Sequence, residues 1–328
     1  MAVTNTNYTQ SFAALNYSGF LFNKGNTATP LTSMISGRQK TTNHVEFSTG
    51  VEWTSGTGTQ PAISEDASLV APDGSTKTRE QKTNVTQIFQ YTYGVSDAKE
   101  SNMGTMAGLN IAGQQPNPIS ERTFQRMAVL NKCAQDIEYT FLNGAYNKAT
   151  ADDEVNKTRG LLTAITSVNN QLGGKAITYW DVCDTIKALQ DENAPTDNLV
   201  LGVNGVTRLQ INADATQNKL TIVDNGRTIN GINIMEYLTP MGRIGIVDLK
   251  YLPSGTAVLF NPAVLAPVHQ IVPGKGNFYE EELAKLGAGT RWQIFGQVGL
   301  DYGPEWYHAK ITGISTTFVH PGEESSSS

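Results

Sequence analysis

Residues 44–55 read HVEFSTGVEWTS and residues 85–95 read VTQIFQYTYGV, and these two stretches decide how the first third of the chain can fold. In the first stretch, Val45, Phe47, Val51 and Trp53 share one parity. In the second, the residues at 89, 91, 93 and 95 are apolar or aromatic and alternate with polar ones. Apolar side chains at every second position are typical of a strand with one buried face. We therefore predict two strands that pair with each other as a long β hairpin.

The connection between these strands, residues 56–84, is about 29 residues of mostly Gly, Thr, Ser, Pro and charged side chains. That is far longer than an ordinary hairpin loop. A two-stranded ribbon is only marginally stable in water. The ribbon therefore needs another surface to pack on, and we expect a neighbouring subunit to provide it.

Residues 1–43 are mostly polar with scattered aromatic side chains, which predicts an extended arm that docks elsewhere. Basic and acidic residues balance over 1–95, so this segment favours contact with protein subunits over a DNA-binding tail. The charged residues of the loop are expected to set register more than affinity. The predicted contacts between subunits are Tyr8, Phe12, Phe20, Phe22, Trp53, Lys77, Arg79, Glu80 and Lys82.

A long helix is predicted over residues 120–147. Ser120 is a good N-cap, and Glu121 favours the first helical turn. Apolar residues at 127, 130, 134, 137 and 141 then repeat at spacings of three and four, which forms one stripe along the helix.

The following region alternates helix and strand. A helix is predicted from a capping-box-like start at Thr178 and Asp181 to residues 193–195, and a second helix over 206–217. Strands are predicted at 199–204, 220–223, 232–238, 244–249 and 256–260, and near the C-terminus at 291–300 and 306–314. The alternation indicates a compact α+β or α/β domain.

Bulk properties exclude several classes of protein. The net charge is -6 with no basic stripe, which argues against a strong nucleic-acid footprint. The N-terminus has no signal-peptide pattern, and no apolar run approaches the ~18 residues of a membrane helix. Cys133 and Cys183 form no CxxC pair, and we expect two buried, reduced thiols.

A search for chemistry finds no catalytic, cofactor or metal site. His44, His269, His308 and His320 are far apart and form no HExxH motif, so each is expected to be a structural or surface residue. There is no GxSxG elbow, and the glycines around Lys175 and Lys275 fail the P-loop spacing and are expected to be turns. Glu280, Glu281 and Glu282 are expected to be a solvated face. The chain is not expected to be an enzyme.

The order of these elements resembles the HK97-type fold of major capsid proteins from tailed bacteriophages. Three stretches resemble one branch of it, the phage SU10-like major capsid proteins: QIFQYTYGVS at 87–96, DIEYTFLNG at 136–144 and VGLDYGP at 298–304. The resemblance implies an α+β fold with an N-terminal arm (1–43), an extended loop (44–95), a peripheral domain (96–170 and 263–328) with a spine helix (120–147), and an axial domain (171–262).

The function that this resemblance implies is self-assembly. Hexamers and pentamers would form an icosahedral or prolate phage head that encloses the DNA genome, with assembly in the bacterial host cytoplasm. The implied partners are other copies of the chain, a portal, scaffolding or decoration proteins, and packaged double-stranded DNA bound without specificity, but no membrane. The alternatives are an encapsulin-like nanocompartment shell and, less favoured, a secreted β-rich binding protein or hydrolase.

Overall fold

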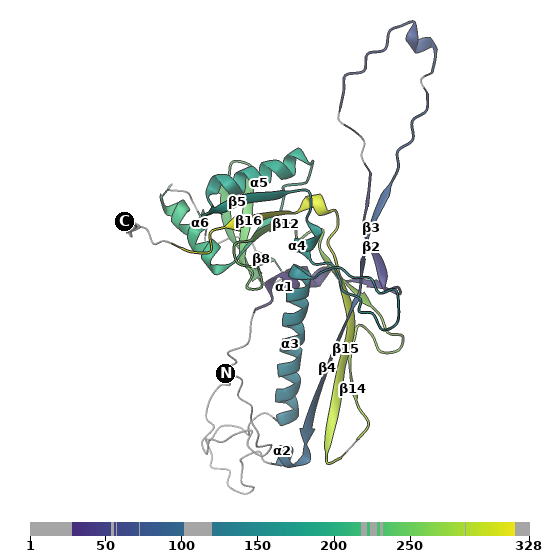
Figure 1. Cartoon of the computed structure of the whole chain (residues 1–328), viewed down its shortest axis with the longest axis vertical. Helices are drawn as coiled ribbons and strands as arrows, with labels where there is room; N and C mark the ends of the chain where they lie inside the picture. The colour runs from purple at the N-terminus through teal and green to yellow at the C-terminus, as the bar shows by residue number, and fades with distance from the viewer. Residues whose placement is uncertain are drawn as a thin grey trace.

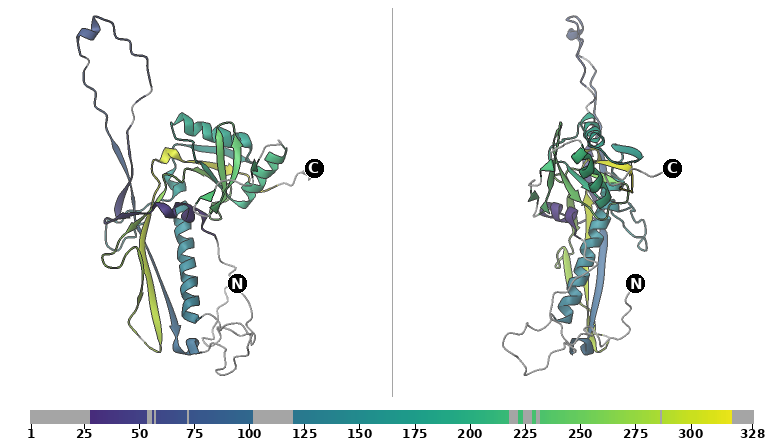
Figure 2. Two further views of the ribbon diagram at one scale, coloured as in Figure 1. Left: turned by 180° about the vertical axis from the view of Figure 1, so that it is seen from behind. Right: turned by 90° about the vertical axis from the view of Figure 1, so that its left-hand side faces the viewer.

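The computed structural model describes residues 28–53, 56, 58–71, 73–101, 120–217, 222–223, 228–229, 232–285 and 287–318. Two lobes and one projection make up this part of the chain (Figure 1). An elongated lobe contains the longest helix and the longest strands, and a compact lobe contains α5 and α6. A thin ribbon with a wide loop extends away from both lobes, as the two further views also show (Figure 2).

The elongated lobe is built on a five-stranded sheet with the order β1-β13-β15-β14, in which β4 also pairs with β15. All of these pairs are antiparallel except β1 with β13. The strands are β1 (Lys40–Thr42), β4 (Gln87–Ser96), β13 (Ala266–Gln270), β14 (Phe278–Glu282) and β15 (Gly289–Asp301).

Helix α3 (Glu121–Asn143) packs on one face of this sheet and begins where the sequence predicts. The Ser120 hydroxyl accepts a hydrogen bond from the Thr123 N–H at 3.3 Å. The helix ends four residues before the predicted residue 147, because the chain folds back at Gly144. A Cβ on Gly144 would lie 2.5 Å from the Thr158 carbonyl oxygen, and one on Gly160 would lie 2.4 Å from the Gly144 nitrogen.

Only part of the predicted apolar stripe of α3 is buried. Phe141 is inaccessible and Ile137 packs against the core around it, but Met127 is 53% exposed and Leu130 is also exposed. In the C-terminal half of the helix, the Tyr91 hydroxyl of the sheet donates a hydrogen bond to Asp136 at 2.7 Å.

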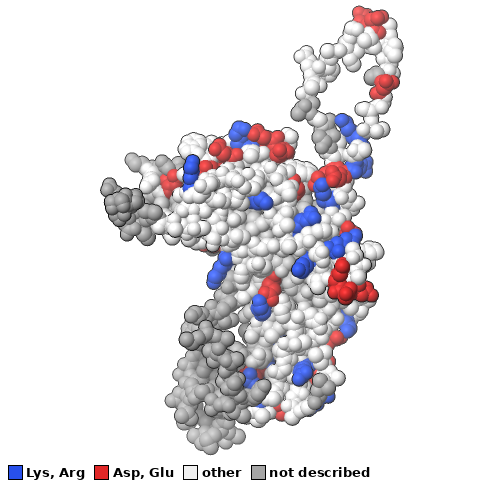
Figure 3. All heavy atoms as spheres, viewed as in Figure 1, with Lys and Arg blue, Asp and Glu red and all other residues white. Residues whose placement is uncertain are grey.

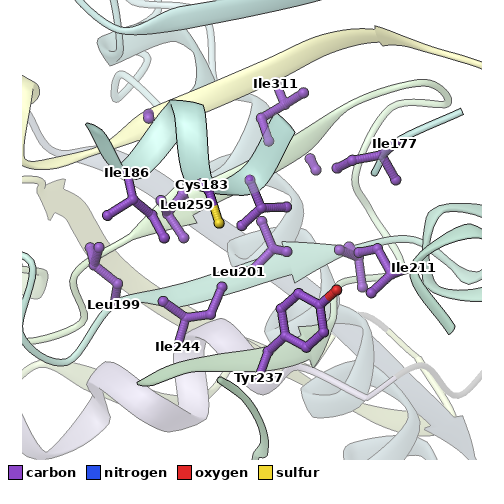
Figure 4. Packing of buried hydrophobic residues seen from close by; sticks show 14 of the residues in the cluster. Ile177, Cys183, Ile186, Leu199, Leu201, Ile211, Tyr237, Ile244, Leu259 and Ile311 are labelled. Carbon is purple, nitrogen blue, oxygen red and sulfur yellow. The ribbon is translucent and has the colours of Figure 1, made fainter. Parts of the chain in front are cut away.

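The compact lobe is built on a seven-stranded sheet with the order β5-β16-β12-β6-β11-β10-β7. Helix α5 (Tyr179–Asp191) begins with the predicted capping box of Thr178 and Asp181, and α6 is Gly205–Gln217. The core beneath these helices includes Cys183, Leu201 and Tyr237 (Figure 4). The strands are β5 (Asn169–Lys175), β6 (Val200–Val203), β7 (Ile222–Val223), β10 (Met235–Thr239), β11 (Gly242–Asp248), β12 (Ala257–Phe260) and β16 (Ala309–Ile314).

Shorter elements connect these parts. The remaining strands form two ribbons, β2 with β3 and β8 with β9. The bounds are α1 (Pro30–Ile35), η1 (Ser36–Arg38), β2 (Glu46–Glu52), η2 (Ala67–Leu69), β3 (Glu80–Val85), α2 (Asp97–Ser101), α4 (Leu161–Ala164), β8 (Thr228–Ile229), β9 (Ile232–Asn233) and η3 (Glu305–Tyr307).

The predicted pairing of residues 44–55 with 85–95 is wrong. Strand β2 pairs with β3, which lies inside the segment predicted as loop, and β4 pairs with β15 along ten residue pairs. The alternation in β4 identifies its buried face but not its partner strand. That face is covered by α3 and continues across β15 through Trp292 and Ile294, a larger core than a lone hairpin offers.

Two expectations about domain limits need correction. The last strand, β16, lies in the sheet of the compact lobe beside β5 and β12, and not with the other C-terminal strands. The predicted arm is also not wholly separate, because Leu31, Met34 and Ile35 of α1 are buried in the core of this chain.

Both cysteines are free and buried, as predicted. None of the described helices is long and apolar enough to cross a bilayer.

Helix α1 is attached to α3 by a buried carboxylate. Glu138 of α3 is 1% exposed and accepts hydrogen bonds from the Leu31 N–H at 2.9 Å, the Thr32 N–H at 2.7 Å and the Thr32 hydroxyl at 2.5 Å. Burial raises the pKa of Glu138, and these hydrogen bonds oppose that rise. The carboxylate thus satisfies two N–H groups at the start of α1 that no helical carbonyl can reach.

His308 joins the two lobes. It is fully buried, its Nδ1 accepts a hydrogen bond from the Asn261 N–H at 3.3 Å, and its Nε2 lies 2.8 Å from the Tyr302 carbonyl oxygen. Because Nδ1 accepts, Nε2 carries the proton and donates it to that carbonyl. Asn261 follows β12 and Tyr302 follows β15, so the ring connects the two sheets.

We predict that Glu138→Ala destabilises the subunit. Leu31 would keep a buried N–H without an acceptor, at a cost of about 1–3 kcal/mol, and the partly buried Thr32 N–H would also lose its acceptor. Chemical denaturation of dissociated subunits measures this loss, and Asn131→Ala, at an exposed position of the same helix, is the control. Equal stability of the two variants would contradict the proposed role of Glu138.

We predict that His308 makes the subunit less stable in acid. Burial lowers the pKa of His308 from 6.5 to about 4. Between these two pH values the unfolded chain is protonated at His308, whereas the folded chain is not. The stabilisation is therefore complete above pH 6.5 and is lost as the pH falls toward 4, at up to about 1.4 kcal/mol per pH unit.

An NMR titration of the histidine rings checks this directly. The His308 ring should stay neutral at pH 5.5. In denaturation experiments, His308→Gln should flatten the pH dependence in this window. A His308 ring that titrates near 6.5 contradicts the prediction.

Candidate functional site

The β2–β3 ribbon is the part of the chain with the least support from the rest of it. Its strands are antiparallel, with Glu46 opposite Val85 at the base and Glu52 opposite Glu80 at the outer end. The register shifts between Ser48 and Gly50, which places a β-bulge in β2. The ribbon and the loop that it carries extend away from both lobes (Figures 1 and 2).

The loop beyond the ribbon exposes apolar side chains. Trp53 follows β2 and is 61% exposed, and Val51 of β2 is exposed as well. Beside the short turn η2, Leu69 is 81% exposed, and Ile63 and Val70 are similarly accessible. Every described residue from 53 to 81 is exposed, so the described part of the chain covers none of these apolar groups. Apolar groups that gather on one accessible element mark an interaction surface.

The charged residues of the ribbon lie mainly at its outer end. Lys82 pairs with Glu80 at 2.6 Å, while Glu52 and Glu80 lie opposite each other across the strands. Partial burial raises the pKa of Glu52, with smaller contributions from Glu305 and Glu80, and Lys82 opposes the rise. Two carboxylates directly opposite each other weaken a strand pair. The outer end is therefore held less firmly than the base.

The predicted contact residues fall into two groups. Trp53, Lys77, Arg79, Glu80 and Lys82 all lie on the ribbon or its loop and are accessible or partly so. Tyr8, Phe12, Phe20 and Phe22 lie outside the described residues. The structure therefore brings one group together on a single projection and does not describe the other.

Further surfaces of the elongated lobe were not identified from the sequence. The face of β4 opposite α3 carries Ile88, Gln90 and Thr92, and Ile88 is 57% exposed. A groove of about 310 Å³ runs between β4 and α3, lined in part by Phe89, Tyr91, Asp136 and Tyr139. The sequence signal that could have identified this surface is the set of even-numbered positions of β4, because their side chains must point away from the buried face.

The charges are mixed rather than segregated. Lys, Arg, Asp and Glu side chains are interspersed on the face seen in Figure 3, and the outermost part of the loop is uncharged or acidic there. Such a surface suits contact with other protein chains more than a continuous backbone of phosphates.

The positions searched for chemistry have structural roles. His269 packs edge-on to Phe278, and burial lowers its pKa, while His320 lies outside the described residues. Gly274 and Gly276 have positive φ at the predicted turn. Gly173 and Gly174 also have positive φ, but the turn predicted there is wrong, because both lie in β5 where its register against β16 shifts. The solvated face predicted at 280–282 is wrong for Glu280, which pairs with Arg126 at 2.7 Å. No group of side chains suited to a metal ion occurs within the described ranges.

Comparisons with solved structures identify the fold. The chain is similar to the SrpI encapsulin of Synechococcus elongatus PCC 7942, with a TM-score of 0.64, 9% identity and coverage of 94% of this chain and 96% of that one. It is similar to the capsid protein of cyanophage A-1(L), with a TM-score of 0.61, 11% identity and coverage of 90% and 95%.

The capsid protein of cyanophage P-SCSP1u gives a TM-score of 0.57 at 11% identity, with coverage of 90% and 91%. At such identities the likeness shows the fold alone, which is the predicted HK97-type fold. A comparison with curated protein sequences gives no match.

The family is shown by a sequence model. The model of the SU10 major capsid protein family matches residues 3–315, which is nearly the whole chain and includes the stretches 87–96, 136–144 and 298–304 that carry the resemblance. The chain therefore belongs to the SU10 major capsid protein family, whose members are structural proteins of the virion and not enzymes.

Proposed function

We propose that this major capsid protein assembles into hexamers and pentamers, which form the icosahedral or prolate head of a tailed phage around its DNA. The observation that carries the proposal is the exposed apolar loop at the end of the ribbon, which the described part of its own subunit does not cover. Closed symmetry repeats each contact around the shell, so individually weak contacts suffice.

On this proposal the two lobes correspond to the domains of the family. The elongated lobe is the peripheral domain with α3 as its spine helix, and the compact lobe is the axial domain, which gathers at the five- and six-fold axes. Strand β16 then belongs to the axial domain, because it lies in that sheet. Residues 1–43 act as the arm and residues 44–85 as the extended loop.

The loop contacts a neighbouring copy through two kinds of residue. Trp53, Ile63, Leu69 and Val70 provide apolar area, which contributes roughly 25 cal/mol for each Å² buried. Lys77 and Arg79, with the Glu80–Lys82 pair, set the register of the contact. The arm residues Tyr8, Phe12, Phe20 and Phe22 are proposed to make a second set of contacts.

The remaining partners follow from the role of a phage head. A portal, a scaffolding or decoration protein, and packaged double-stranded DNA held without base specificity are proposed partners, with assembly in the cytoplasm of the bacterial host. An encapsulin-like compartment is the second candidate, because the SrpI encapsulin shares the fold. Electron microscopy of virions, combined with peptide mapping of their shell, separates the two. Tailed, DNA-filled particles built from this chain support the phage head, and tailless shells filled with protein cargo refute it.

We predict that replacing the apolar groups of the loop blocks assembly without unfolding the subunit. A variant with Ile63, Leu69 and Val70 changed to Ser removes side chains that are largely exposed in the isolated chain, so its melting temperature should change little. Each of these residues contributes about 1.5 kcal/mol or more when buried against a neighbour, which is about a tenfold change in the association constant.

The assembled fraction is measured by sedimentation velocity and negative-stain microscopy of the whole chain. The control changes Leu209 of α6 and Leu238 of β10, which are also exposed but lie in the compact lobe, to Ser. Assembly of the loop variant at the wild-type concentration would refute the proposed contact.

A further inference from the structure

The base of the β2–β3 ribbon differs from its outer end in how it is held. We call Glu46–Ser48 of β2 and Thr83–Val85 of β3 the ribbon root. Side chains of the root are partly or fully buried, except for Ser48, whereas Val51 and Trp53 are about 60% exposed. The root is therefore part of the elongated lobe, and only the region beyond it projects.

Asn84 lies at the centre of the root and is completely inaccessible to solvent. Its Nδ2 donates to the carbonyl oxygens of Leu300 at 2.8 Å and Arg159 at 3.1 Å. Its Oδ1 accepts from the N–H groups of Arg159 at 2.8 Å and Val85 at 2.9 Å. An amide side chain has two donor hydrogens and one acceptor oxygen with two lone pairs, so every hydrogen-bonding position of Asn84 is used. The side chain ties β3 to β15 and to the segment that follows α3.

Neighbouring contacts hold the other strand of the root. Glu46 pairs with Lys148 at 2.5 Å and accepts a hydrogen bond from the Thr83 hydroxyl at 2.8 Å. The Phe47 ring lies on the backbone of β15, where a Cβ on Gly299 would come within 2.7 Å of it. Only glycine permits this approach, so the position of β2 against the lobe is closely defined.

The support ends at the bulge. Thr49 is 4% exposed, and its hydroxyl has no hydrogen-bond partner within the described part of the chain. A Cβ on Gly50 would lie 3.7 Å from Gly303 and Pro304, so the ribbon still lies beside the lobe at this point. Beyond it, the carboxylates of Glu52 and Glu80 lie opposite each other, Glu52 is only partly buried, and every described residue from 53 to 81 is exposed.

We propose that Asn84 is a positioning residue for assembly, which fixes the direction of the ribbon at its root and confines its bending to the bulge at Thr49 and Gly50 and the region beyond. The inference rests on the proposed contact between the loop and a neighbouring copy. A fixed root gives each loop the same starting direction, so successive subunits meet at a uniform angle and the shells have one size. The outer part bends to fit each local environment.

Hydrogen exchange of the unmodified, dissociated subunit tests where the rigid part ends. Amides of the root that pair across the strands should be as protected as those of β4, and protection should be lost from Gly50 to Gln81. Exchange that is already fast at Phe47 and Thr83 would place the bend at the base and overturn the proposal.

Two variants test the consequence for assembly. Asn84→Ala removes all four hydrogen bonds of the Asn84 side chain, and Asn84→Ser is a milder change at the same position. The control is Gln210→Ala in the compact lobe. Gln210 is 4% exposed, donates to the carbonyl oxygens of Ser315 and Thr317, and accepts from the Ile177 N–H. Both parent residues are thus buried amides that join separate segments, and only one of them holds the ribbon.

Particle diameters are measured by electron microscopy. The variants are compared under conditions in which the Asn84 and Gln210 substitutions lower the melting temperature of the subunit by the same amount. The Asn84 variants should lose the single narrow diameter class and form shells of mixed size or open sheets, whereas Gln210→Ala should keep it. Normal particles from the Asn84 variants, or the same disorder from Gln210→Ala, would overturn the proposal. If unmodified chains form no particles at all, the proposed shell function fails instead, and the exchange experiment still decides where the ribbon bends.

Discussion

The pairing of β4 with β15 is the constraint on which the elongated lobe depends. It joins residues 87–96 to residues 289–298 in a continuous antiparallel register, so opposite ends of the chain form one surface. Helix α3 packs on that surface through Cys133 and Phe141, and β13 and β14 extend it on the other side of β15. The same pairing sets the place where β3 leaves the lobe, because β3 and β4 are separated only by Thr86. Such non-local pairs form late and slowly during folding, since a long loop must close first.

The subunit contrasts a well-packed body with a projection that has no core. The two lobes bury large apolar clusters, while the loop beyond the ribbon leaves Leu69 and Trp53 in solvent. A monomeric protein gains nothing from this arrangement, because exposed apolar side chains promote association. On the proposed function, the same area becomes useful when a second copy covers it. The charged residues around the apolar groups then disfavour wrong registers, because unmatched charges would be left without partners.

Three buried polar side chains connect segments that are distant in the sequence. Glu138 ties the start of α1 to α3, Asn84 ties the ribbon root to β15, and His308 ties the end of β12 to the end of β15. Each has its hydrogen bonds satisfied, which is the condition for a buried polar group to add specificity without a large penalty. Apolar packing alone tolerates small shifts of register, whereas a saturated amide or imidazole accepts one arrangement. These residues therefore define how the arm, the ribbon and the two lobes are placed.

The amino-acid sequence by itself determined the local elements and the family. The start of α3 at Ser120, the capping box of α5, the helix near 206–217 and the buried face of β4 follow from capping and periodicity, which are short-range properties of the chain. The projecting ribbon with Trp53 and Lys82 was also predictable, because its loop has too few apolar residues to fold alone. Only the tertiary structure decided which strands pair: β2 with β3, β4 with β15, and β16 in the sheet of the compact lobe. Periodicity defines which face of a strand is buried but not which strand lies beside it, and roles such as those of Glu138, Asn84 and His308 exist only once distant segments meet.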